Sequence, residues 1–181
     1  MYGLVNKAVK DLVVSNFGEE TWNEIANAAG AEHHFISMDT YDDAVTYRLV
    51  EEASKLLEVP AEDLLRQFGE YWITYTASEG YGPIVDMFGA SLEEFLRHLG
   101  NDLHGRVAMT MPDLHPPEFA TEEVAPSHFH VHYKSHRQGL SPMVLGLLEG
   151  LAARYQAEAT VAHKHTVSDS PCHEVFEVII H

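Results

Sequence analysis

The hydrophobic period of this chain is helical up to a group of prolines and mostly alternating after it. Before the prolines, apolar residues recur at helical spacing, beginning with Val5, Val9 and Leu12. After them, alternating runs predict strands on either side of one helical stretch. The expected strands and helix cover residues 127–133, 142–155, 159–167 and 174–180. This order predicts an α+β fold, in which an N-terminal helical part packs with a small antiparallel sheet and an inserted helix.

Capping residues and helix breakers set the expected boundaries of these elements. Gly18 should end the first helix and Gly30 the second, and a third helix is expected from Asp42 to Leu57. Pro60 fits the first turn of the helix that follows. That helix should be interrupted at Gly80, Gly82 and Pro83. An extended connection is expected through Pro112, Pro116, Pro117 and Pro126.

Length and composition predict a single domain that covers residues 1–181, without repeats or a low-complexity linker. A chain of this size buries about 70% of its unfolded surface, which is enough to enclose a cofactor. No apolar run approaches the roughly 20 residues of a membrane span, and the N-terminus lacks a signal-peptide pattern. A soluble, cytoplasmic protein is therefore expected. Cys172 is the one cysteine, so the chain has no internal disulfide framework.

The net charge of −17 argues against nucleic-acid binding, because phosphate backbones are bound by clusters of Lys and Arg. The excess of acidic residues is instead typical of a well-solvated surface. We also find no phosphate-binding glycine loop, no nucleophile elbow and no His-Glu-x-x-His helix. The sequence therefore does not predict an enzyme.

Tyr133, Ser135 and Arg137 are spaced by two residues, so in an extended segment they would project from one side. A phenol, a hydroxyl and a guanidinium all donate hydrogen bonds, and arginine matches a carboxylate with two of them. A ligand that carries acid groups is the interpretation that these donors favour. The alternative is a strand end whose polar groups meet solvent.

His104 borders a strongly apolar helical stretch. The spacing of Ser91 and Glu94 predicts a capping box that begins this helix. Apolar residues follow on one arc: Leu92, Phe95, Leu96, Leu99, Leu103 and Val107. Gly100, one turn before His104, leaves room for a flat ring. A neutral imidazole commonly holds a haem iron, so His104 is a candidate axial ligand, and an ordinary packed histidine is the alternative.

These residues occur in an order that resembles the H-NOX family, the haem domains that bind nitric oxide and oxygen and include the sensor region of soluble guanylate cyclase. The resemblance runs almost from end to end. The matching segments are Met1-Tyr2-Gly3-Leu4-Val5-Asn6, Phe68-Gly69-Glu70-Tyr71-Trp72, Leu103-His104, Pro116-Pro117, Tyr133-x-Ser135-x-Arg137 and Leu145-Gly146-Leu147-Leu148-Glu149-Gly150.

The resemblance implies the H-NOX fold, with haem buried between the helical part and the sheet. It assigns His104 as the axial ligand of the iron, and Tyr133, Ser135 and Arg137 as the residues that hold the haem propionates. Pro117 would press on the macrocycle, and the resemblance also places Val5 and Leu147 against the haem. The haem would be noncovalent haem b, because the chain has no Cys-x-x-Cys-His segment.

The distal pocket is expected to exclude oxygen. Oxygen-binding relatives have a hydrogen-bonding tyrosine at the position that aligns with Met143, and methionine has no hydrogen to donate. Trp72 is also assigned to this pocket, with a packing role favoured over donation. The resemblance therefore implies a sensor that binds nitric oxide and carbon monoxide at ferrous haem. Nitric oxide would release His104 and its helix, and an oxygen-binding H-NOX protein is the alternative.

A separate effector would then receive the signal. The chain is expected to end where the H-NOX domain ends, and bacterial relatives commonly signal to a histidine kinase or a cyclic-di-GMP enzyme.

A His-rich metal-binding protein is a further alternative. His128, His130 and His132 would share one strand face, and His163 and His165 repeat that spacing. A row of solvated imidazoles is the simpler interpretation of this pattern. Cys172 and His173 hint at a zinc cluster of some relatives, but the companion cysteines are missing, so that site is not assigned.

Overall fold

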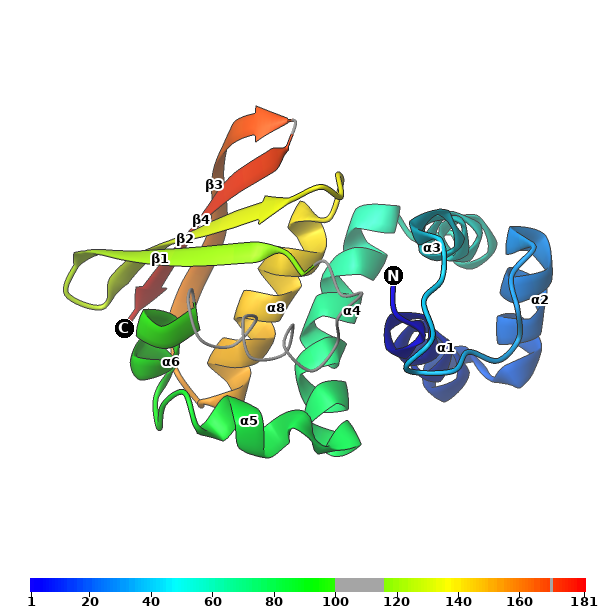
Figure 1. Cartoon of the computed structure of the whole chain (residues 1–181), viewed down its shortest axis with the longest axis horizontal. Helices are drawn as coiled ribbons and strands as arrows, with labels where there is room; N and C mark the ends of the chain where they lie inside the picture. Colours follow the sequence, from blue (N-terminus) through cyan, green and yellow to red (C-terminus); the bar gives the residue numbers. More distant parts are fainter. Residues whose placement is uncertain (100–115, 170) are drawn as a thin grey trace. The chain divides into compact units, whose positions relative to one another are not determined.

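The computed structural model describes residues 1–99, 116–169 and 171–181. The described chain forms two compact units, Met1–Phe68 and Gly69–His181. Figure 1 shows the elements of each unit. His104 and Gly100 lie outside the described residues.

The first unit is helical. Its helices are α1 (Gly3–Phe17), α2 (Glu19–Ala29), α3 (Asp43–Leu57) and the beginning of α4 (Ala61–Thr76). Trp22, Ile25 and Leu49 have no exposed surface and form the centre of its core. The apolar spacing predicted these helices, and burial of their apolar faces holds them together.

The helix ends of the first unit follow the predicted capping residues. Gly18 joins α1 to α2 with a φ of 88°, a backbone conformation that residues with a side chain rarely adopt. Gly30 ends α2 in the left-handed region. Asp42 caps α3 by accepting a hydrogen bond from the Ala44 N–H at 2.9 Å. Pro60 directly precedes α4 and accepts hydrogen bonds from two amides of its first turn.

The expected break after α4 takes a different form, because the backbone remains helical. A π-helical turn, η1 (Ala77–Tyr81), follows α4 and leads directly into α5 (Gly82–Asp86). Pro83 is the second residue of α5, so the position without an amide hydrogen comes directly after the π-helical turn. Glycine and proline therefore change the helical period here without ending the helix.

The sheet of the second unit has four antiparallel strands among the described residues, in the order β1-β2-β4-β3. They are β1 (Glu118–Ala125), β2 (His128–Ser135), β3 (Ala159–Asp169) and β4 (Cys172–Ile180). The sequence predicted the last three and missed β1, which was expected as an extended connection. β1 is an edge strand with mostly exposed side chains, so it lacks the apolar alternation that identifies the others.

Two helices cover one face of the sheet, as Figure 1 shows. α6 (Leu92–His98) begins at Ser91, whose Oγ accepts the Glu94 N–H at 3.2 Å, as the predicted capping box requires. α8 (Ser141–Arg154) follows β2. Phe95, Phe129 and Phe176 lie at the centre of the core between these helices and the sheet.

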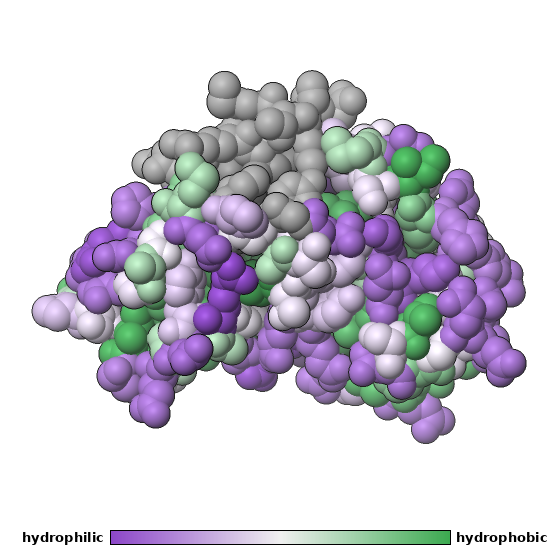
Figure 2. All heavy atoms as spheres, turned by 90° about the horizontal axis from the view of Figure 1, so that it is seen from below, coloured by the Kyte–Doolittle hydropathy of each residue, from purple (hydrophilic) through white to green (hydrophobic). Residues whose placement is uncertain are grey.

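The surface view is consistent with the composition of the chain. Figure 2 shows mainly hydrophilic side chains on the displayed face, with small apolar patches between them. None of the described helices is long and apolar enough to cross a membrane.

Candidate functional site

β2 brings two of the three predicted donors to the covered face of the sheet. Its buried residues alternate with partly exposed ones up to Ser135, and Tyr133 and Ser135 are 3% and 7% exposed. In the register of β2 and β4, Tyr133 is opposite Glu174 and Ser135 is opposite Cys172. The two-residue period thus places both hydroxyl groups on the same covered face, as predicted.

The position of Arg137 is not determined by the strand that places Tyr133 and Ser135. β2 ends at Ser135, so the alternation of a strand does not determine where Arg137 points. A turn places it instead: the Arg137 N–H donates to the Ser135 Oγ at 3.0 Å. This contact uses the hydroxyl of Ser135 as an acceptor and leaves its own hydrogen to donate. The donor set therefore fits carboxylate groups of a ligand.

Pro117 lies at the same end of the sheet. The pairing of β1 with β2 begins at Glu118 opposite Lys134, directly after Pro117, and continues with Phe119 opposite Tyr133. The rings of Phe119 and Tyr133 pack with their centroids 5.3 Å apart. Pro117 is half-buried, and it enters the strand where its missing amide hydrogen breaks no ladder bond.

Glu174 is a buried carboxylate that the sequence analysis missed. It is 8% exposed and accepts hydrogen bonds from His163 Nε2 and Thr166 Oγ1, both at 2.7 Å. Burial favours a higher pKa, but hydrogen bonds from Thr166, His163 and Cys172 outweigh it and hold the pKa of Glu174 below its ordinary value. A charged group therefore stands opposite Tyr133. A glutamate within an apolar strand run was the available signal.

The thiol of Cys172 is part of the same cluster. It lies 3.5 Å from the Glu174 carboxylate, and burial together with this neighbour raises its pKa to about 11. His173, the next residue, turns to the other face and contacts His132 at 3.1 Å between ring nitrogens. Cys172 and His173 therefore do not converge on one ion.

α4 and α8 approach so closely that backbone meets backbone. A Cβ on Gly69 of α4 would overlap the Met143 carbonyl oxygen and lie 2.8 Å from the Leu147 nitrogen. Met143 and Leu147 are both half-buried and lie one turn apart on α8. This contact fixes the part of α8 that carries both predicted pocket residues.

Trp72 lies one turn after Gly69 on α4 and is half-buried. Its ring packs against Tyr75, with centroids 6.0 Å apart. Val5 belongs to the first unit, where it is half-buried on α1. The roles of Trp72, Val5 and His104 toward a cofactor remain predictions.

The opposite face of the sheet carries the three histidines of β2. His128, His130 and His132 alternate with the buried residues of β2, so they share one face as predicted. His163 and His165 do not share a face, because a β-bulge between them shifts the register. His163 faces the covered side and bonds Glu174, whereas His165 is paired with Val175 on the other side. Period-two spacing alone could not reveal this bulge.

Comparison with known proteins gives matches along most of the chain. The haem-NO-binding family matches residues 2–163. Soluble guanylate cyclase gcy-32 of Caenorhabditis elegans is 30% identical over 158 residues, 85% of this chain and 23% of that protein. Guanylate cyclase soluble subunit beta-2 of Rattus norvegicus is 34% identical over 91 residues, 50% of this chain and 13% of that protein. The chain thus spans less than a quarter of these relatives.

Solved structures match the fold of the whole chain. An H-NOX protein from S. oneidensis in the Fe(II)NO ligation state has a TM-score of 0.89 at 20% identity, and the match covers 100% of this chain and 99% of that one. An unliganded Fe(II) H-NOX protein from K. algicida has a TM-score of 0.87 at 22% identity, over 100% and 97% of the two chains. At these identities the likeness establishes the fold.

Proposed function

We propose that this chain, which belongs to the haem-NO-binding (H-NOX) family, senses nitric oxide with a noncovalent, ferrous haem b. The family match over residues 2–163 is the observation that carries the proposal. The proposal treats residues 1–181 as a single H-NOX domain, and its role is sensing rather than catalysis.

The residues of the second unit fit a cofactor with acidic tails. Tyr133, Ser135 and Arg137 would hold the propionates, and the burial of the two hydroxyl residues on one sheet face supports this assignment. His104 is proposed as the axial ligand of the iron. Pro117, Leu147 and Val5 are proposed to pack against the ring. When bound, the haem iron supplies the coordination site for a diatomic gas.

Selectivity for nitric oxide and carbon monoxide over oxygen would come from Met143. Oxygen binding in such a site depends on a hydrogen-bond donor, and a thioether offers none. The indole of Trp72 is proposed to pack rather than donate, and its contact with the Tyr75 ring supports that role. Nitric oxide would weaken the bond from His104 to the iron and release the segment that carries this residue.

The released segment would be read by a separate signalling protein, such as a histidine kinase or a cyclic-di-GMP enzyme. The guanylate cyclases among the relatives extend well beyond the part that this chain matches. A bistable element whose two states bind a partner differently is sufficient for such a signal.

Absorbance spectra test the proposal directly. The reduced protein should show a Soret band that shifts under nitric oxide and under carbon monoxide and stays unchanged in air. His104→Gly should alter the spectrum of the reduced protein. A colourless protein from cells supplied with porphyrin would overturn haem binding, and a stable spectrum of the oxygen complex in air would overturn the selectivity alone.

Met143→Tyr tests the cause of the selectivity. The phenol adds the missing donor, so this variant should gain a response to air, whereas Met143→Leu, which changes shape without adding a donor, should not. Equal behaviour of the two variants would remove Met143 as the determinant.

A further inference from the structure

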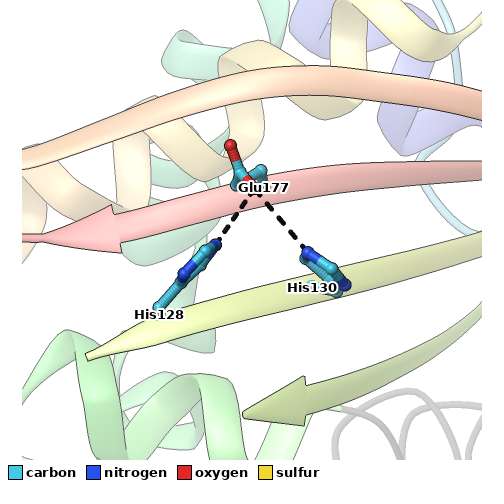
Figure 3. Close-up of side chains that lie close together, drawn as sticks. All are labelled: His128, His130 and Glu177. Carbon is cyan, nitrogen blue, oxygen red and sulfur yellow. Dashed lines mark hydrogen bonds and ion pairs between the residues drawn. The ribbon is translucent and has the colours of Figure 1, made fainter. Parts of the chain in front are cut away.

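A cluster of side chains on the outer face of the sheet has no part in the proposed gas sensing. His128 and His130 of β2 point toward Glu177 of β4, as Figure 3 shows. They project from the side opposite Tyr133 and Ser135, because neighbouring residues of a strand alternate between faces. The side chains of the cluster are 20–28% exposed, so a small solute can reach them.

Strand pairing brings these three residues together. His130 and Glu177 are direct cross-strand partners, and His128 is two residues away on the same face. The Glu177 Oε1 atom lies 3.0 Å from His128 Nε2 and 3.7 Å from His130 Nε2. The three ligand atoms all lie within 4.8 Å of one another. In a tetrahedral zinc site with bonds of about 2.0–2.1 Å, neighbouring ligand atoms are about 3.3 Å apart, so small side-chain rotations suffice.

A cation already stands beside this cluster. The ammonium of Lys164 lies 2.8 Å from His130 Nε2 and 2.9 Å from the Glu177 Oε1. An ammonium can only donate, so His130 Nε2 must present its lone pair, which is the state that a metal ligand requires. The Glu177 Oε1 atom also accepts hydrogen bonds from His128 and Lys164, so this carboxylate oxygen faces the cluster.

We propose that His128, His130 and Glu177 form a binding site for a divalent transition-metal ion, with Zn²⁺ as the representative ion, and that Lys164 competes with the ion for the same acceptors. Two imidazoles and a carboxylate are the donor types that such ions prefer, and they leave a fourth position for water. The site lies on the face away from Tyr133 and Ser135, the residues proposed to bind the propionates. Its metal binding is therefore independent of the proposed gas sensing.

Zinc titration of the haem-loaded chain by calorimetry tests the site. One zinc ion should bind per chain, with the Soret band unchanged. His128→Ala, His130→Ala and Glu177→Gln should each weaken binding about tenfold or more, because each removes one ligand. Lys164→Met should bind zinc about tenfold more tightly, because the competing charge is gone. Lys134→Met is the matched control, since it removes the same charge from β2 outside the cluster.

The Lys164→Met variant keeps the test decisive, because a gain of affinity cannot arise from a damaged fold. Equal gains in Lys164→Met and Lys134→Met would overturn the specific competition. A dissociation constant above about 1 mM for the unmodified chain would overturn the site itself. Loss of binding in His132→Asn, with His130→Ala unaffected, would place the ion on the His132–His173 pair and would likewise reject the proposal.

Discussion

Glu174 determines much of the chemistry on the covered face of the sheet. It is a buried carboxylate that stays charged because three side chains donate to it. Such a group stabilises the fold only while all of its hydrogen bonds are made, since a buried donor without an acceptor costs about 1–3 kcal/mol.

Glu174→Gln should therefore reduce the free energy of unfolding at pH 7 by about 1–3 kcal/mol, because a neutral amide accepts these hydrogen bonds less well. The effect should depend on pH. The folded-state pKa of Glu174 lies below the ordinary value of 4.5, so its stabilisation is present above that value and is lost as the pH falls through the folded-state pKa. Urea unfolding at pH 7 and at about pH 3 should show the difference from the unmodified chain shrinking in acid.

Glu122→Gln is the control for this prediction, because Glu122 is an exposed glutamate on β1. It should change stability by less than about 0.5 kcal/mol. A pH-independent difference for Glu174→Gln would show that the carboxylate charge contributes nothing to the fold.

Single residues of the candidate site were predicted unevenly, and the reasons are physical. Tyr133 and Ser135 followed from the period of a strand, which fixes faces wherever the strand is regular. Arg137 lies beyond the strand end, where a turn takes over. Glu174 and Lys164 acquire their roles from cross-strand neighbours, and a sequence alone does not give the register of its strands.

At the scale of elements, the contact between α4 and α8 depends on two glycines. Both helices carry half-buried residues of the candidate site, and their backbones touch at Gly69 and again at Gly150. At Gly69 all the close atoms belong to the backbone of α8, which cannot move without shifting Met143 and Leu147.

Gly69→Ala should reduce the free energy of unfolding by about 1–3 kcal/mol, because overpacking outweighs the helix propensity of alanine. Gly150→Ala is the matched control. Its Cβ would lie 3.1 Å from two backbone atoms of Glu70 and from the Ile73 side chain, a close contact without the overlap found at Gly69, so the loss of stability should be smaller. Thermal unfolding of both variants measures the difference. Equal losses would show that the Gly69 contact is no tighter than the other.

The elements themselves were largely predictable from periodicity and capping. The helices of the first unit, α6, α8, β2, β3 and β4 follow local signals that the structure confirms. β1 was missed because an exposed edge strand carries no apolar pattern. The two register shifts in β3 were missed because an extra residue in a ladder leaves no mark in the sequence.

At the scale of the whole molecule, the prediction of a single domain means that the two compact units should unfold cooperatively. Each compact unit contains one tryptophan: Trp22 lies in the first and Trp72 in the second. Trp22 is fully buried, and its indole donates to the His33 carbonyl at 3.2 Å. The two indoles therefore serve as separate reporters of the two units.

In Trp72→Phe, the emission of Trp22 should change at the same urea concentration as the far-UV circular dichroism of the whole chain. The reciprocal variant, Trp22→Phe, should show the same agreement for Trp72, although its midpoint should be lower because a buried ring is made smaller. Coincident transitions are what one cooperative domain requires. Emission and ellipticity midpoints that separate within a variant would show that the units unfold independently.

β2 lies between two partner strands and serves both faces of the sheet from alternating residues. The register of this one strand consequently determines the faces of both the inward hydroxyls and the outward imidazoles. Inserting or deleting one residue ahead of Tyr133 would exchange the two sets in a single step. The edge strand β3 accommodates additional residues at two register shifts, whereas an additional residue in β2 would disrupt two ladders at once. Substitutions in β2 can therefore change the hydroxyls or the imidazoles separately, whereas a change in the length of the strand affects both.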